Sequence, residues 1–191
     1  MNLPNLHSTL LILIFSLMAS SSMKEMQIIP ADELERQGAL FFYNETRFTG
    51  QALEFYPNGR LKSSSVFVEG MRDGEHLAYH EDGKLASSRI YKANKKHGKH
   101  LGWWPNGNQK FSYQFKNGLQ EGESKEWFEE GELFREMHYT KGKEEGSQKM
   151  WEADGSIRAN YVVKNGRRYG LIGLKNCKSV SNEEGFTAIQ Y

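Results

Sequence analysis

Acidic side chains in one segment are the first candidates for chemistry, because two carboxylates at a suitable separation can act as general acid and base. Most of these glutamates occupy turns or the polar positions of an alternating pattern, so we expect them to be solvated surface residues. No sequence typical of a serine hydrolase, a zinc protease or a phosphate-binding loop is present. The sequence therefore predicts that the protein is not an enzyme. The glutamates are Glu121, Glu123, Glu126, Glu129, Glu130 and Glu132.

Histidines are the next candidates, as metal ligands. His76 and His100 occupy equivalent positions of neighbouring repeat units, with His80 and His97 close in sequence. Equivalent positions are two strands apart, about 9.6 Å at the usual strand spacing. Zinc needs its ligands within about 2.1 Å, so we expect exposed strand histidines, with no metal site and no cofactor.

Cys177 is the single cysteine, which excludes a disulfide framework and a Cys-rich zinc module. Two roles remain open for it: a thiol that pairs with another chain, or a small hydrophobic residue in the C-terminal cap, which we favour. The formal net charge is +1 over 191 residues. Such a balance lacks the basic field that non-specific nucleic-acid binding needs, so we expect no nucleic-acid partner.

The head of the chain resembles a secretory signal. An apolar run at residues 10–19 is followed by three serines, and the run is too short for a membrane-spanning helix. We expect residues 1–22 to be a signal peptide cleaved near residues 19–23, which gives a secreted or periplasmic protein. No cysteine follows the run, so lipoprotein attachment is excluded. The alternative is a buried N-terminal strand or helix.

Glycines repeat with a period of 24 residues. One column runs from Gly50 to Gly170, a second from Gly59 to Gly155, and a third from Gly70 to Gly166, with Asn94 in one slot. These columns contain 15 of the 19 glycines. A fixed period of this size indicates a repeat architecture.

Each 24-residue unit is predicted to form one β-hairpin. Apolar and polar residues alternate on both sides of a turn such as Pro57-Asn58-Gly59, which suits a type I turn closed by a left-handed glycine bulge. The fold class is therefore all-β: a single-layer antiparallel meander of about five hairpins with atypical ends. We expect an N-terminal cap at residues 23–47, with a short helix at Glu33–Arg36 and a strand at Gly38–Tyr43. The array follows at 48–173 and a C-terminal tail at 174–191.

Aromatic residues form a further column four positions before the second glycine column. We expect it to share one face with the column of Phe67, Tyr91, Phe115 and Tyr139. A one-layer ribbon leaves part of such a face uncovered, and an uncovered apolar face marks a binding site. Trp104, Phe128 and Tyr56 fall outside this pattern and are predicted to make outward contacts. The first column is Phe55, Tyr79, Trp103, Trp127 and Trp151, and the predicted binding residues are Tyr56, Tyr79, Trp103, Trp104, Trp127, Phe128 and Trp151.

The motifs resemble a known family. The unit Gly-x4-aromatic-x3-Gly, the segment Trp103-Trp104-Pro105-Asn106-Gly107 and the closing Asn117-Gly118-x3-Gly122 are similar to the bacterial variant of the MORN repeat. Proteins of this kind are grouped as YwqK-type antitoxins. The resemblance covers residues 48–173, and it implies a scaffold, a dimerisation module, a lipid-binding surface or an antitoxin.

Two functions from different classes follow as expectations. The first is a non-catalytic, exported scaffold that binds another protein, or a glycan or other envelope component, along the aromatic ribbon. The alternative is an antitoxin that sequesters a toxin in the cytoplasm. Peripheral membrane contact is a variant of the first, although the mixed charges of the polar face lack a basic cluster.

Overall fold

The computed structural model describes residues 26–173, and this part of the chain is all-β. One 3₁₀ turn, η1 (Ala31–Glu33), lies among the strands. No helix between residues 26 and 173 has the length and apolar character to cross a membrane. The strands are β1 (Gln27–Pro30), β2 (Glu35–Gln37), β3 (Leu40–Tyr43), β4 (Thr46–Arg47), β5 (Gly50–Phe55), β6 (Leu61–Val68), β7 (Met71–Tyr79), β8 (Leu85–Lys92), β9 (Lys95–Trp103), β10 (Gln109–Lys116), β11 (Leu119–Gln120), β12 (Gly122–Trp127), β13 (Leu133–Thr140), β14 (Lys143–Trp151), β15 (Ile157–Lys164) and β16 (Arg167–Leu171).

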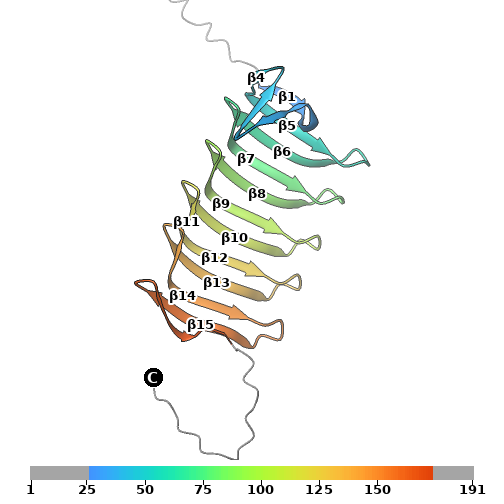
Figure 1. Cartoon of the computed structure of the whole chain (residues 1–191). Helices are drawn as coiled ribbons and strands as arrows, with labels where there is room; N and C mark the ends of the chain where they lie inside the picture. Colours follow the sequence, from blue (N-terminus) through green and yellow to red (C-terminus); the bar gives the residue numbers. More distant parts are fainter. Residues whose placement is uncertain (1–25, 174–191) are drawn as a thin grey trace, which may run out of the picture.

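Most of these strands form one long sheet, in which neighbours in sequence are neighbours in space. The strand order is β1-β5-β6-β7-β8-β9-β10-β12-β13-β14-β15-β16, with β11 paired to β10. Figure 1 shows the hairpins succeeding one another from the N-terminal end to the C-terminal end. All pairs are antiparallel except β1 with β5. The predicted all-β antiparallel meander is confirmed.

The three-residue turns have the predicted geometry. In the first, the Gly59 amide donates to the Tyr56 carbonyl at 2.9 Å, and the Tyr56 amide donates to the Arg60 carbonyl at 2.8 Å. Gly59 has φ +80°, as a left-handed glycine bulge requires. The Asn58 side chain accepts a hydrogen bond from the Arg60 amide at 3.0 Å. The same backbone bonds recur in the other four units.

The hairpins are joined by two-residue turns in which both central residues have positive φ, the type I′ geometry. Asn94 takes the glycine position of one such turn with φ +64°, as predicted. At Gly70 the requirement is also steric, because a Cβ there would lie 2.8 Å from the Phe41 carbonyl oxygen. The first four of these turns contact the preceding part of the chain through the same backbone bond: the Gly70 amide, for example, donates to the Phe48 carbonyl at 2.8 Å.

A β-bulge after each three-residue turn corrects one prediction. Glu54 pairs with Ser63 but Phe55 pairs with Leu61, so Lys62 is an extra residue. One extra residue inverts the alternation of side chains. The two aromatic columns therefore lie on opposite faces, and the expectation of a single shared face is wrong. The extra residues of the later hairpins are Ala86, Lys110, Phe134 and Arg158.

We call the face that carries Phe67, Tyr91, Phe115 and Tyr139 the groove face. On it, each of these rings lies opposite a glycine of the first column: Phe67 pairs with Gly50 and Tyr91 with Gly74. A glycine on the neighbouring strand leaves room for the ring. This explains why an aromatic residue and a glycine recur together in successive repeats.

The N-terminal cap covers one end of the groove face. β2, β3 and β4 form a separate three-stranded sheet, and Phe41 and Phe48 pack on Phe67 with ring centroids 4.9 and 5.8 Å apart. The Gly38–Tyr43 strand is confirmed over Leu40–Tyr43. The helix expected at Glu33–Arg36 is wrong, because η1 ends at Glu33 and the next residues pair with β3. Residues 1–22, the tail 174–191 and Cys177 lie outside the described residues.

Candidate functional site: a groove and an aromatic corner

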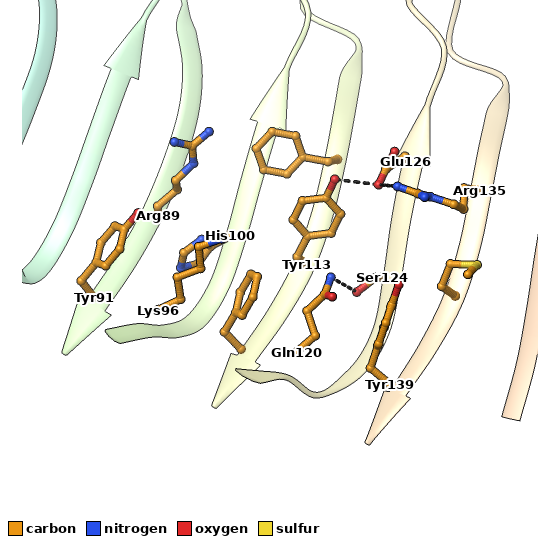
Figure 2. A pocket seen from close by; sticks show the side chains of 13 residues that line it. Arg89, Tyr91, Lys96, His100, Tyr113, Gln120, Ser124, Glu126, Arg135 and Tyr139 are labelled. Carbon is orange, nitrogen blue, oxygen red and sulfur yellow. Dashed lines mark hydrogen bonds and ion pairs between the residues drawn. The ribbon is translucent and has the colours of Figure 1, made fainter. Parts of the chain in front are cut away.

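A groove lies on the groove face in the middle of the array, across β8 to β13. Its volume is about 550 Å³, within the usual range for small-molecule sites. Figure 2 shows its side chains converging from successive strands. They are Arg89, Tyr91, Lys96, His100, Phe111, Tyr113, Phe115, Gln120, Ser124, Glu126, Arg135, Met137 and Tyr139.

Two stacked rings form part of the groove wall. Phe111 and Tyr113 follow one another on the groove face of β10, with ring centroids 4.8 Å apart and planes 10° apart. Phe111 also lies over Gly102, its partner on β9, where a Cβ would overlap the ring. This packing fixes the position of both aromatic side chains.

An acid–base network lies beside these rings. The Tyr113 hydroxyl donates to Glu126 at 2.7 Å, and the Arg135 guanidinium pairs with the same carboxylate oxygen (Figure 2). Burial, together with the bond to Glu126, raises the pKa of Tyr113 far above its usual value. The phenol therefore stays neutral and acts as a donor, while the Glu126 charge is compensated within the protein.

Two histidines lie at the N-terminal side of the groove, where His100 lines it and His76 lies outside its lining. His76 and His100 are neighbours of Arg89 on adjacent strands, and the His100 ring lies 5.5 Å from Tyr91 and 4.6 Å from Phe115. Burial lowers the pKa of His76, and the nearby Arg72 and Arg89 lower it further. Burial also lowers the pKa of His100.

The histidines are occupied by protein contacts. His100 is 2% exposed, and its Nε2 lies 2.8 Å from the Ile90 carbonyl oxygen; His76 bonds Ser65. The expectation of exposed histidines is thus wrong for His100, because the bulky column beside it covers the ring. Among residues 26–173 no group of three or more side chains is arranged to hold a metal ion.

Two cations of the groove have no carboxylate partner among the described residues. Arg89 lies with its guanidinium carbon 5.7 Å from the Phe111 ring centroid, and the Lys96 ammonium lies 4.9 Å from that of Phe115. The ion pairs of residues 26–173 include neither of them. In the same groove Arg135 is paired with Glu126, so the charge left uncompensated is positive.

Three predicted binding residues gather at one corner of the sheet, beside the three-residue turns. Trp104, Trp127 and Phe128 line a second hollow of about 510 Å³ together with Phe134 and Lys110. We call these five residues the aromatic corner. The Phe128 and Phe134 rings are 5.0 Å apart, and the Lys110 ammonium lies 4.0 Å from the Trp104 ring. Phe134 and Lys110 are bulge residues, so the bulges supply two of the five residues of the corner.

Tyr56 and Trp104 also tie the repeats together. The Tyr56 hydroxyl donates to the Tyr79 carbonyl at 2.8 Å, and the Trp104 indole N–H donates to the Trp127 carbonyl at 3.1 Å. At the position between them, His80 contacts the Trp103 carbonyl at 3.0 Å. Tyr56 and Trp104 are therefore half-buried and connect neighbouring repeats through their polar atoms. Their contact with a partner stays a prediction.

The remaining predicted residues, Tyr79, Trp103 and Trp151, line neither the groove nor the corner. Of the acidic cluster, only Glu126 lines the groove, and it adjoins the corner with Glu129 and Glu130. The groove residues Arg89, Lys96 and Tyr113 were missed as site residues. The alternation of polar and apolar residues could have indicated that they share one face of the sheet. It assigns them to the groove face only when the position of the bulge is known.

The comparisons with known proteins agree with the geometry. The model of the MORN repeat variant matches residues 48–69, 72–93 and 120–141, which correspond to the hairpins β5–β6, β7–β8 and β12–β13. No curated protein matches the chain. Residues 96–117 and 144–165 have the same two-turn hairpin geometry in register with these segments. The chain is thus an all-β repeat protein in which three hairpins are similar to the MORN repeat variant.

Proposed function

We propose that this protein is a non-catalytic binding scaffold, and that a partner protein docks on the aromatic corner. The observation that carries the proposal is the gathering of Trp104, Trp127, Phe128 and Phe134 around one hollow. Aromatic side chains of this kind are enriched in the cores of protein interfaces. A single-layer sheet has no second layer to cover them.

The proposal includes that the protein is not an enzyme. This part is supported by the polar groups of the groove, which are already paired or protonated. Glu126 is compensated by Arg135, and Tyr113 holds its proton. The His100 ring is engaged by a backbone carbonyl. None of the three is a free general acid or base.

The proposal also includes export of the protein from the cytoplasm. The apolar run at residues 10–19 supports export, and the scaffold would then act outside the cytoplasm. The alternative, an antitoxin of the YwqK type, requires a full-length chain in the cytoplasm next to its toxin. Intact mass and cell fractionation separate the two: a chain shortened by about 22 residues supports export, and a full-length cytosolic chain supports the antitoxin.

The docking experiment uses the immobilised protein to capture partners from the extract of its own source, with quantification by mass spectrometry. Phe128→Ser removes a corner ring that makes no hydrogen bond to another repeat. Phe55→Ser is the matched control, since Phe55 is an aromatic residue beside the first three-residue turn, 52% exposed and outside the corner. We expect a partner that the wild type and Phe55→Ser retain and Phe128→Ser loses. Equal capture by all three would contradict the proposal.

A further inference from the structure

The groove contains positive charge that the described part of the protein does not neutralise. Its lining carries Arg89, Lys96 and Arg135 against the single carboxylate Glu126. Because Arg135 is bound to Glu126, the excess is located at Arg89 and Lys96. These two project into the groove from neighbouring strands, β8 and β9 (Figure 2).

The surroundings raise the energetic cost of this charge. His76 and His100 lie beside Arg89, and their pKa values are lowered by burial and by the neighbouring cations. Glu54, the carboxylate that acts on His76, is bound by Lys62 at 2.7 Å. Arg89 is partly buried, whereas Lys96 is exposed. A partly buried cation without a counterion is unfavourable, so this cost falls on Arg89. An oxyanion that accepts hydrogen bonds from the Arg89 guanidinium relieves the cost, and the Lys96 ammonium supplies a second charged donor.

The rest of the groove lining determines what should accompany the oxyanion. Beyond Arg89 and Lys96, the lining is aromatic or apolar at Phe111, Tyr113 and Tyr139, with the buried Met137. Planar apolar groups pack well against such rings. The volume of about 550 Å³ suits a small molecule, and a concave hollow of this kind does not fit a flat membrane surface.

We propose that the groove binds a small ring compound that carries an oxyanion, a phosphate or a carboxylate. Arg89 and Lys96 hold the oxyanion, and the ring lies against Tyr113 and Tyr139. The oxyanion end of this site differs from the docking site of a partner protein, because Arg89 and Lys96 do not line the corner hollow and Phe128 and Trp104 do not line the groove. Phe111, Tyr113 and Glu126 line both hollows.

Titration calorimetry on the purified protein tests the proposal, with phenyl phosphate and benzoate as probes. Inorganic phosphate supplies the oxyanion without a ring, and benzyl alcohol supplies a ring without the charge. We expect phenyl phosphate or benzoate to bind more tightly than both reference compounds. The better of the two identifies the oxyanion.

Three variants locate the bound probe. Arg89→Gln and Lys96→Gln should each weaken binding about tenfold, the range of one charge-assisted hydrogen bond. Lys92→Gln, an exposed position on β8 outside the groove, and Phe128→Ser should both bind as the wild type does. No binding of either ring oxyanion to the wild type, equal binding of inorganic phosphate, or unchanged affinity in both groove variants would overturn the proposal. These outcomes leave the capture experiment at Phe128 unaffected.

Discussion

The capped end and the uncovered middle of the array carry the same repeat position in two different environments. At the N-terminal end Phe67 is 3% exposed, beneath Phe41 and Phe48. In the middle, the equivalent Tyr91 and Tyr139 are half-buried and line the groove. The difference teaches that the covering layer buries the ring column fully at the cap, whereas the middle is covered unevenly. Phe115 is 7% exposed there, but Tyr91 and Tyr139 on either side of it stay half-buried and available to a ligand.

The largest expected effect is a difference in the stability lost when a ring is removed from the capped end or from the uncovered middle. Phe48→Ala removes a cap ring that is 2% exposed, and loss of such a ring typically costs about 3–5 kcal/mol. Tyr139→Ala removes a half-buried ring and should cost about 1 kcal/mol. Urea unfolding of the two variants measures both values. Equal losses would show that the middle is as well covered as the cap.

A second prediction concerns the packing of the groove wall. Gly102→Ala places a methyl group where the Phe111 ring lies, so the ring and its stacked neighbour Tyr113 must move. Overpacking of this kind typically costs about 1–3 kcal/mol. Gly107→Ala is a control for the loss of glycine, because nothing lies within 4 Å of a Cβ there, although its positive φ carries its own strain. Thermal unfolding gives the stability loss. An unchanged near-ultraviolet circular dichroism spectrum of Gly102→Ala would contradict displacement of the rings.

The hairpins of the array can be predicted from short sequence segments, but the face of the sheet on which each side chain lies cannot. The period of 24 residues and segments such as Pro57-Asn58-Gly59 specify the hairpins, because the turn residues require particular backbone angles. The bulge at Lys62 has no such signal: Leu61-Lys62-Ser63 reads as continued alternation. The inverted faces therefore could not be predicted from local sequence.

The candidate site was accessible to sequence reasoning only in part. Trp127 and Phe128 were found because they break the alternation or continue a column. Arg89 and Lys96 were missed, since an isolated basic residue on a strand is usually solvated. Only the tertiary structure shows that both lie in one groove without a carboxylate partner in the described part of the chain.

The third prediction uses the two histidines beside the groove. The folded-state pKa values of His76 and His100 are lowered, so the unfolded chain binds protons at a higher pH than the folded chain does. Their contribution to stability is unchanged well above about pH 6.5 and is lost as pH falls below it. The loss is about 1.4 kcal/mol for each unit by which a pKa is lowered.

Melting temperatures at pH 7.5 and pH 5.5 test this expectation. His76→Gln removes one of the two titrating groups, so the difference between the two temperatures should become smaller than in the wild type. Glutamine is neutral at both values of pH, and its own effect on stability cancels in that difference. An identical pH dependence in the wild type and the variant would contradict a titrating role for His76.

The smallest expected effect concerns the bonds between repeats at the corner. Trp104→Phe keeps a ring and removes the N–H that reaches the Trp127 carbonyl, so stability should fall by about 1 kcal/mol. Trp151→Phe serves as the reference, since Trp151 has no side-chain hydrogen bond to another repeat among residues 26–173. Equal stability of the two variants in urea would show that this bond contributes nothing.

The central claim is that a partner binds the uncovered middle of the array. The signals of the four tryptophans can report where it binds. Trp104 and Trp127 line the corner, whereas Trp103 and Trp151 do not. Indole ¹⁵N NMR of the full protein, with and without the captured partner, should show shifts of the Trp104 and Trp127 signals while the Trp151 signal stays in place. Unchanged corner signals, or a shift confined to Trp151, would contradict the claim.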